Sequence, residues 1–142
     1  MARVVVDASL AVKWVLPEID SRQALSLYQS WVKQRQEILA PSLLQYEVSN
    51  AIWKACRRGD LSWEMGLRAL ETLLRLRFTV LQPPNLLREA WGMARVYRLP
   101  TTYDAAYLAL AKLEGCELWS GDTRLLNTVA GRLPWVRGLA PA

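Results

Sequence analysis

The sequence contains no histidine among its 142 residues. This absence excludes serine–histidine and cysteine–histidine nucleophiles, histidine-based ribonuclease chemistry and the usual zinc sites. Any hydrolysis by this chain must therefore depend on carboxylates, most simply together with a metal ion that they hold.

Cysteine is scarce, and long apolar runs are missing. Cys56 and Cys116 form neither a disulfide framework nor a zinc-binding spacing, so we expect both to be buried small apolar groups. No apolar stretch reaches the roughly 18 residues that span a bilayer. The N-terminal apolar region is interrupted by Asp7 and Lys13 and makes a poor signal-peptide core. We expect a soluble, cytoplasmic protein without membrane contact.

Lysine is also rare, so the net charge of +5 comes mainly from arginine. A basic chain suits a polyanion or an acidic partner, although a solvated basic surface would give the same balance. The composition, 52% hydrophobic and 22% charged, is that of a globular chain rather than a disordered one. We expect residues 1–142 to form a single domain with one core.

Short apolar runs alternate with helical patterns along the whole chain. The predicted strands are 3–6, 37–40, 78–81, 117–120 and, at the edge, 135–139. The predicted helices are 10–16, 20–34, 41–58, 62–76, 85–97, a helix carrying Asp104 that Gly115 ends, and 122–129. Strands separated by helices predict an α/β fold with a parallel sheet flanked by helices.

Four acidic residues stand out by their positions. Asp7 and Asp122 follow the first and fourth predicted strands, and Asp104 opens a helix. Glu47 lies on or beside the apolar stripe of helix 41–58. Because side chains beyond the carboxyl ends of parallel strands face the crevice where ligands bind, we expect the acids to share one cleft.

Each of these acids also has a purely structural explanation. Asp7 and Asp122 would serve as N-caps of the helices that follow, although Ser9 is the cap we expect for helix 10–16. Asp104 stands three residues after Thr101, as in a capping box, and Glu47 would pair with a nearby arginine.

Taken together, however, four anions in one cleft repel each other and raise one another's pKa values unless a cation is present. Oxygen ligands of this kind suit hard divalent ions, Mg²⁺ or Mn²⁺. Such an ion binds phosphate oxygens and activates water. Basic residues outside the cleft would attract the nucleic-acid backbone that the acids repel.

Five sequence runs, in order, resemble the PIN-domain family, and more narrowly the VapC-type toxins of prokaryotic type II toxin–antitoxin pairs. They are VVVDAS at 4–9, KWVLPE at 13–18, PSLLQYEVSN at 41–50, YDAAYLALA at 103–111 and LWSGD at 118–122. The resemblance extends over nearly the whole chain, from the first strand to Leu126.

The resemblance implies a three-layer α/β/α sandwich with a central, mostly parallel sheet. It also implies a Mg²⁺- or Mn²⁺-dependent endoribonuclease, a homodimer, and neutralisation by a small VapB-like antitoxin that inserts a basic side chain into the cleft. By position, the metal-binding and catalytic acids would be Asp7, Glu47, Asp104 and Asp122. Ser9 and Ser120 match the hydroxyl positions that support the site, with Ser120 where the family often has threonine.

Exposed arginines would hold the RNA, and the candidates are Arg57, Arg58, Arg124 and Arg132. Two alternatives stay open, a PIN nuclease outside any toxin–antitoxin pair and a catalytically idle PIN scaffold that binds nucleic acid or protein. A phosphoaspartate phosphatase or receiver domain is disfavoured, because Ser9 stands where a second acid is needed and no acid pair precedes Asp7.

Overall fold

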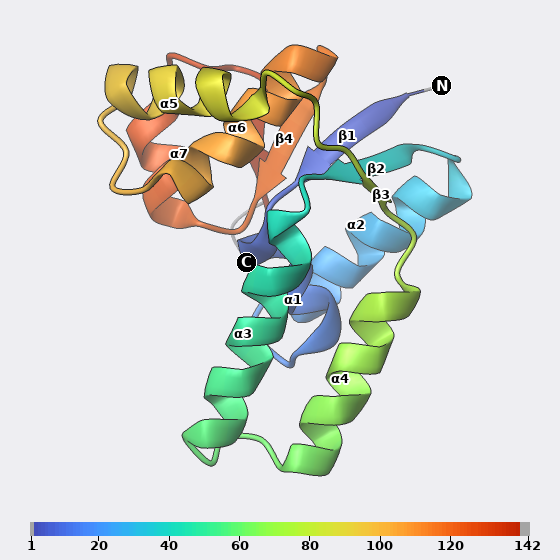
Figure 1. Ribbon diagram of the computed structural model, residues 1–142. Coiled ribbons are helices and arrows are strands. Elements are labelled where there is room, and N and C mark those ends of the chain that lie inside the picture. The colour runs from blue at the N-terminus through green and yellow to red at the C-terminus, as the bar shows by residue number, and fades with distance from the viewer. Residues whose placement is uncertain (1, 140–142) are drawn as a thin grey trace.

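The computed structural model describes residues 2–139 (Figure 1). Its five strands form one sheet in the order β3-β2-β1-β4-β5, and every neighbouring pair is parallel. The strands are β1 (Arg3–Val6), β2 (Glu37–Ala40), β3 (Thr79–Val80), β4 (Glu117–Ser120) and β5 (Val136–Gly138). The predicted parallel sheet is confirmed, including its edge strand.

Helices flank the sheet as the alternating pattern predicts. They are α1 (Ala8–Val15), α2 (Ser21–Lys33), α3 (Leu43–Arg57), α4 (Trp63–Arg75), α5 (Leu86–Val96), α6 (Thr102–Glu114) and α7 (Thr123–Val129). Helices α5, α6 and α7 gather on one side of the molecule, and α1 and α2 lie on the other (Figure 1). Helices α3 and α4 pack against each other and against α1, and they project beyond the sheet (Figure 1).

Helix α6 is the centre of the core on its side of the sheet. Seven consecutive residues, 105–111, are buried, because the helix packs against β1, β4 and α5 at once. An alanine-rich and leucine-rich helix suits this place, since a helix that is apolar on all sides needs cover on all sides. Asp104 opens α6, so the position of this acid is fixed by the most enclosed helix of the described chain.

The sheet order creates a crevice at the carboxyl ends of β1 and β4. From β1 the chain crosses to β2 on one side, whereas β4 lies on the other side of β1. Ligands of open α/β sheets bind at such a switch point. Asp7 directly follows β1, and Asp122 follows β4 by two residues, so both acids lie at this crevice.

The caps expected for α4 and α6 are present, whereas the one expected for α1 is not. The hydroxyls of Ser62 and Thr101 accept hydrogen bonds at the N-termini of α4 and α6, as expected. At α1 the cap is Asp7, which accepts from the Leu10 N–H at 3.1 Å, and the expectation that Ser9 would cap this helix is wrong. The Ser9 hydroxyl instead donates to the Asp7 carboxylate.

Both cysteines are free thiols, as predicted. Cys56 is buried, but Cys116 is only partly buried, so the expectation of burial holds for the first alone. Over residues 2–139, no helix is long and apolar enough to cross a membrane.

Candidate active site

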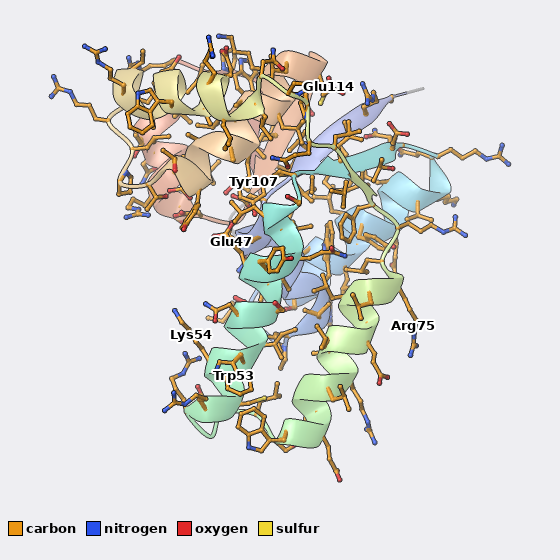
Figure 2. The ribbon with its side chains drawn as sticks, in the orientation of Figure 1. Glu47, Trp53, Lys54, Arg75, Tyr107 and Glu114 are labelled. Atoms are coloured by element: carbon orange, nitrogen blue, oxygen red, sulfur yellow. The ribbon has the colours of Figure 1, made fainter. Side chains whose placement is uncertain are left out.

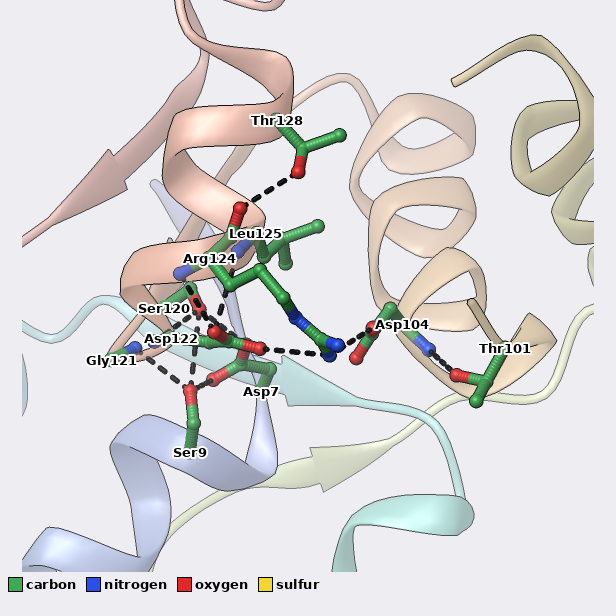
Figure 3. Close-up of polar contacts among 10 residues, drawn as sticks. All are labelled: Asp7, Ser9, Thr101, Asp104, Ser120, Gly121, Asp122, Arg124, Leu125 and Thr128. Carbon is green, nitrogen blue, oxygen red and sulfur yellow. Dashed lines mark hydrogen bonds and ion pairs between the residues drawn. The ribbon is translucent and has the colours of Figure 1, made fainter. Parts of the chain in front are cut away.

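Asp7 is the most enclosed acid of the site, with 4% of its surface exposed. Its Oδ1 accepts from the Ser9 hydroxyl at 2.6 Å, and its Oδ2 accepts from the Ser120 hydroxyl at 2.5 Å. Burial raises the pKa of Asp7 to about 6, although these hydrogen bonds favour the ionised form. Both serines of the sequence prediction thus contact the same carboxylate (Figure 3).

Asp122 is held by the turn between β4 and α7. Its backbone N–H donates to the Ser120 hydroxyl at 3.0 Å, and its Oδ1 accepts from the N–H groups of Arg124 and Leu125. Asp122 therefore caps α7, so the capping explanation considered for this residue is correct. Its Oδ2 remains turned toward the side chain of Arg124 (Figure 3).

Gly121 brings the turn after β4 against the start of α1. Its N–H donates to the Ser9 hydroxyl at 2.9 Å. A Cβ at this position would lie 2.8 Å from the Ser9 carbonyl oxygen and 2.7 Å from Cε of Lys13. Only glycine permits this approach, which keeps Asp122 close to Asp7.

Asp104 and Asp122 face each other across the guanidinium of Arg124 (Figure 3). The Arg124 nitrogen lies 3.7 Å from Oδ2 of Asp104 and 4.0 Å from Oδ2 of Asp122. Burial, and then the charge of Asp122, raise the pKa of Asp104, whereas Arg124 lowers it. The arginine side chain is 68% exposed, so these are loose contacts that solvent screens.

Glu47 reaches the site from α3 and is bound by a residue that the sequence analysis did not single out. The hydroxyl of Tyr107, on α6, donates to Oε1 of Glu47 at 2.6 Å (Figure 2). Burial raises the pKa of Glu47, the Tyr107 bond lowers it, and the charge of Asp104 raises it. The arginine partner considered for Glu47 is replaced by this tyrosine. The available signal was spacing, since Tyr107 lies one helical turn after Asp104.

The four acids are electrostatic neighbours, and we call them the acidic cluster. The charge of Asp122 raises the pKa of Asp7 and of Asp104, and the charge of Asp104 raises that of Glu47. Among residues 2–139, however, no three acidic or cysteine side chains form a group able to hold a metal ion as they stand. Like charges keep apart without a counter-ion, and Arg124 partly fills that role between two of them.

The predicted RNA-binding arginines are dispersed. Arg124 lies at the acidic cluster. Arg57 ends α3 ten residues after Glu47, about 15 Å along the helix. Arg58 follows it and pairs with Asp60. The guanidinium of Arg132 lies 4.6 Å from the centre of the Tyr97 ring. Of the four, the structure brings only Arg124 into contact with the acids.

The family model described as the PIN domain matches residues 4–131. The match includes all four members of the acidic cluster and both supporting serines. The chain therefore belongs to the PIN-domain family.

Comparison with individual proteins narrows this assignment. The chain is 36% identical over 125 residues to Ribonuclease VapC3 of Pyrobaculum aerophilum, an alignment covering 87% of this chain and 92% of the relative. The crystal structure of PAE2754 from Pyrobaculum aerophilum matches with a TM-score of 0.67 and 32% identity, covering 92% of this chain and 88% of that one. A toxin–antitoxin complex from Klebsiella pneumoniae shares the fold, with a TM-score of 0.63, 19% identity and 94% of each chain covered. Within the PIN-domain family the chain belongs with the VapC ribonucleases.

Proposed function

We propose that this chain is a metal-dependent endoribonuclease, the toxin of a type II toxin–antitoxin pair that acts in the cytoplasm. The observation that supports it best is the acidic cluster at the carboxyl ends of β1 and β4. Membership of the VapC ribonucleases supports the choice of RNA as the substrate.

The donor set fits Mg²⁺ or Mn²⁺, because every candidate ligand atom is a carboxylate oxygen. Burial, and after it the charge of a neighbouring acid, raises the pKa values of Asp7, Glu47 and Asp104, and a bound cation would offset both of these costs of ionisation. Asp7, Glu47, Asp104 and Asp122 would hold one or two ions. A bound ion would activate water for in-line attack on a phosphodiester and stabilise the leaving oxygen.

The remaining groups orient the acids and the RNA. The Ser9 and Ser120 hydroxyls fix both oxygens of Asp7, so this carboxylate presents constant lone-pair directions. Arg124 is the candidate contact to an RNA phosphate, because it is exposed and lies against two of the acids. Arg57 and Arg58 remain candidates only for a more distant stretch of the RNA.

The test is hydrolysis of a closed circular RNA by the purified chain, with Mg²⁺, with Mn²⁺ and with EDTA. A circle has no ends, so its conversion to a linear product requires internal cleavage. We expect linear RNA with either ion and none with EDTA. Cleavage of linear RNA but never of the circle would replace the endonuclease by an exonuclease, and cleavage in EDTA would contradict the metal requirement.

Exposed apolar surface supports the proposed protein partners. A groove of about 650 Å³ runs between α3 and α4, and exposed Trp53 and Trp63 lie on its edge with ring centres 5.0 Å apart. On α5, Leu87 and Trp91 are more than two-thirds exposed, one turn apart. We propose that a small acidic VapB-like antitoxin and a second copy of this chain cover such surfaces.

Light scattering of the chain alone and with the antitoxin tests these partners. We expect a homodimer alone and a larger, inactive complex with the antitoxin. A PIN nuclease outside a toxin–antitoxin pair would have no short acidic open reading frame beside its gene. An idle scaffold would bind RNA without cleaving it.

A further inference from the structure

The hydroxyl of Tyr107 connects two helices that carry different members of the acidic cluster. Tyr107 lies on α6, one turn after Asp104, and donates to Glu47 on α3 across 60 sequence positions. Its side chain is buried, with 2% of the residue exposed. Burial raises the pKa of its hydroxyl, and so do the negative charges of Glu47, Asp7 and Asp104. The phenol therefore lies beside Glu47 (Figure 2) and within electrostatic reach of two further acids of the cluster.

The carboxylate of Glu47 is held differently from those of Asp7 and Asp122, which accept capping bonds from backbone N–H groups. Asp7 and Asp122 are fixed by N–H groups two or three residues away, at the starts of their own helices. Glu47 lies in the interior of α3, where the backbone N–H groups are used within the helix, so its long side chain needs an external partner. That partner comes from α6, the most enclosed helix of the described chain.

We propose that Tyr107 is a positioning residue, which holds Glu47 toward the acidic cluster and thereby tightens metal binding. The hydroxyl engages Oε1 and so fixes the orientation of the carboxylate, through which Glu47 would hold an ion. Outer partners that orient metal-ligating carboxylates act in this way on other sites. The inference rests on the proposed function, because it takes Glu47 as a metal ligand.

The phenyl ring by itself does not account for a tyrosine here. A phenylalanine would fill the same buried volume without a polar atom to satisfy, so the hydroxyl adds cost unless its hydrogen bond is used. Its oxygen lies 2.6 Å from a carboxylate, which is a short, charge-assisted bond.

The experiment measures Mn²⁺ affinity without RNA, by electron paramagnetic resonance or calorimetry. The proteins compared are the wild type, Tyr107→Phe, Glu47→Gln and the double variant, together with one control. The matched control is Tyr28→Phe, which removes a tyrosine hydroxyl that accepts from the Arg77 N–H at 2.9 Å outside the site. Thermal melting checks that each variant is folded.

We expect Tyr107→Phe to weaken Mn²⁺ binding about 10–100-fold. The same change should have no further effect in the Glu47→Gln background, because the hydroxyl acts through that carboxylate. Tyr28→Phe should bind Mn²⁺ as the wild type does.

Three results would overturn the inference, and one of them also reaches the proposed function. Unchanged Mn²⁺ affinity in Tyr107→Phe would refute the positioning role while leaving metal-dependent cleavage standing. A further loss in the double variant would show that Tyr107 acts through something other than Glu47. Failure of the folded wild type to bind Mn²⁺ would remove both the inference and the metal requirement of the proposed function.

Discussion

The Ser120 hydroxyl donates a 2.5 Å hydrogen bond to Oδ2 of Asp7, across 113 sequence positions. Both residues are buried; Ser120 ends β4, and Asp7 directly follows β1, the neighbouring parallel strand. The bond ties the two strand ends that carry Asp7 and Asp122, so the acids approach each other because of the sheet order and not because of their spacing along the chain.

The raised pKa of Asp7 predicts that metal-free protein loses stability as the pH rises. Folded Asp7 keeps its proton up to about pH 6, whereas the unfolded chain releases it near the ordinary 3.8. The folded state therefore binds more protons in this window, and its stability falls as the pH rises from about 4 to about 6. The cost of ionising the buried group is on the order of 3 kcal/mol.

Urea unfolding in EDTA at several pH values, compared between the wild type and Asp7→Asn, measures this cost. We expect the wild type to lose stability relative to the variant across that window, and the variant to be the more stable above it. Parallel pH curves for the two proteins would show that Asp7 ionises without a burial penalty.

Gly121→Ala should damage the site, because the new Cβ would meet the Ser9 carbonyl oxygen at 2.8 Å. The clash moves the turn after β4 away from α1, and overpacking of this kind costs about 1–3 kcal/mol. Asp122 is the next residue in the chain, so a shift of this turn would also displace that acid. We therefore expect RNA cleavage to fall together with the free energy of unfolding.

Gly92→Ala is the matched control, because nothing lies within 4 Å of the Cβ that it adds within α5. We expect it to stabilise the helix by about 0.5–1 kcal/mol and to leave cleavage unchanged. Equal effects of the two substitutions would refute the close approach at Gly121.

Arg124→Gln should weaken RNA binding without unfolding the protein. The Arg124 side chain is 68% exposed, and an ion pair of this kind contributes about 0–1 kcal/mol to stability. Loss of one phosphate contact should reduce the slope of log affinity against log salt by about 1.

Arg58→Gln removes the same charge at the end of α3, where Arg58 pairs with Asp60. Filter binding of RNA, with both arginine variants made in the Asp104→Asn protein that we expect to be inactive, measures affinity without cleavage. An unchanged salt slope for Arg124→Gln would remove this residue from the RNA contact.

Much of the fold could be predicted from local pattern, because each strand is a short apolar run between helical segments. The run Val4–Val6 and the helix stop at Gly115 needed no distant information. The capping of α1 was predicted less well, since Asp7 and Ser9 are both good caps and only the backbone geometry decides between them.

The site was predicted in composition but not in its contacts. Positions after strand ends indicate Asp7 and Asp122, because sheet topology alone brings such positions together. The bond from Tyr107 to Glu47 joins two helices 60 positions apart, so no local pattern contains it. The exposure of Trp63, in contrast to the burial of Trp31, likewise depends on α3 and α4 projecting past the sheet.

The most direct measurement is cleavage of RNA in Mn²⁺ by the wild type and by Asp104→Asn side by side. Asparagine keeps the size of the side chain and the start of α6, but it removes the charge that a cation needs. We expect cleavage by the wild type, and a loss in the variant greater than the roughly 10–100-fold typical of an outer partner, with unchanged melting. Full activity of a folded Asp104→Asn protein would contradict the assignment of the acidic cluster as the catalytic centre.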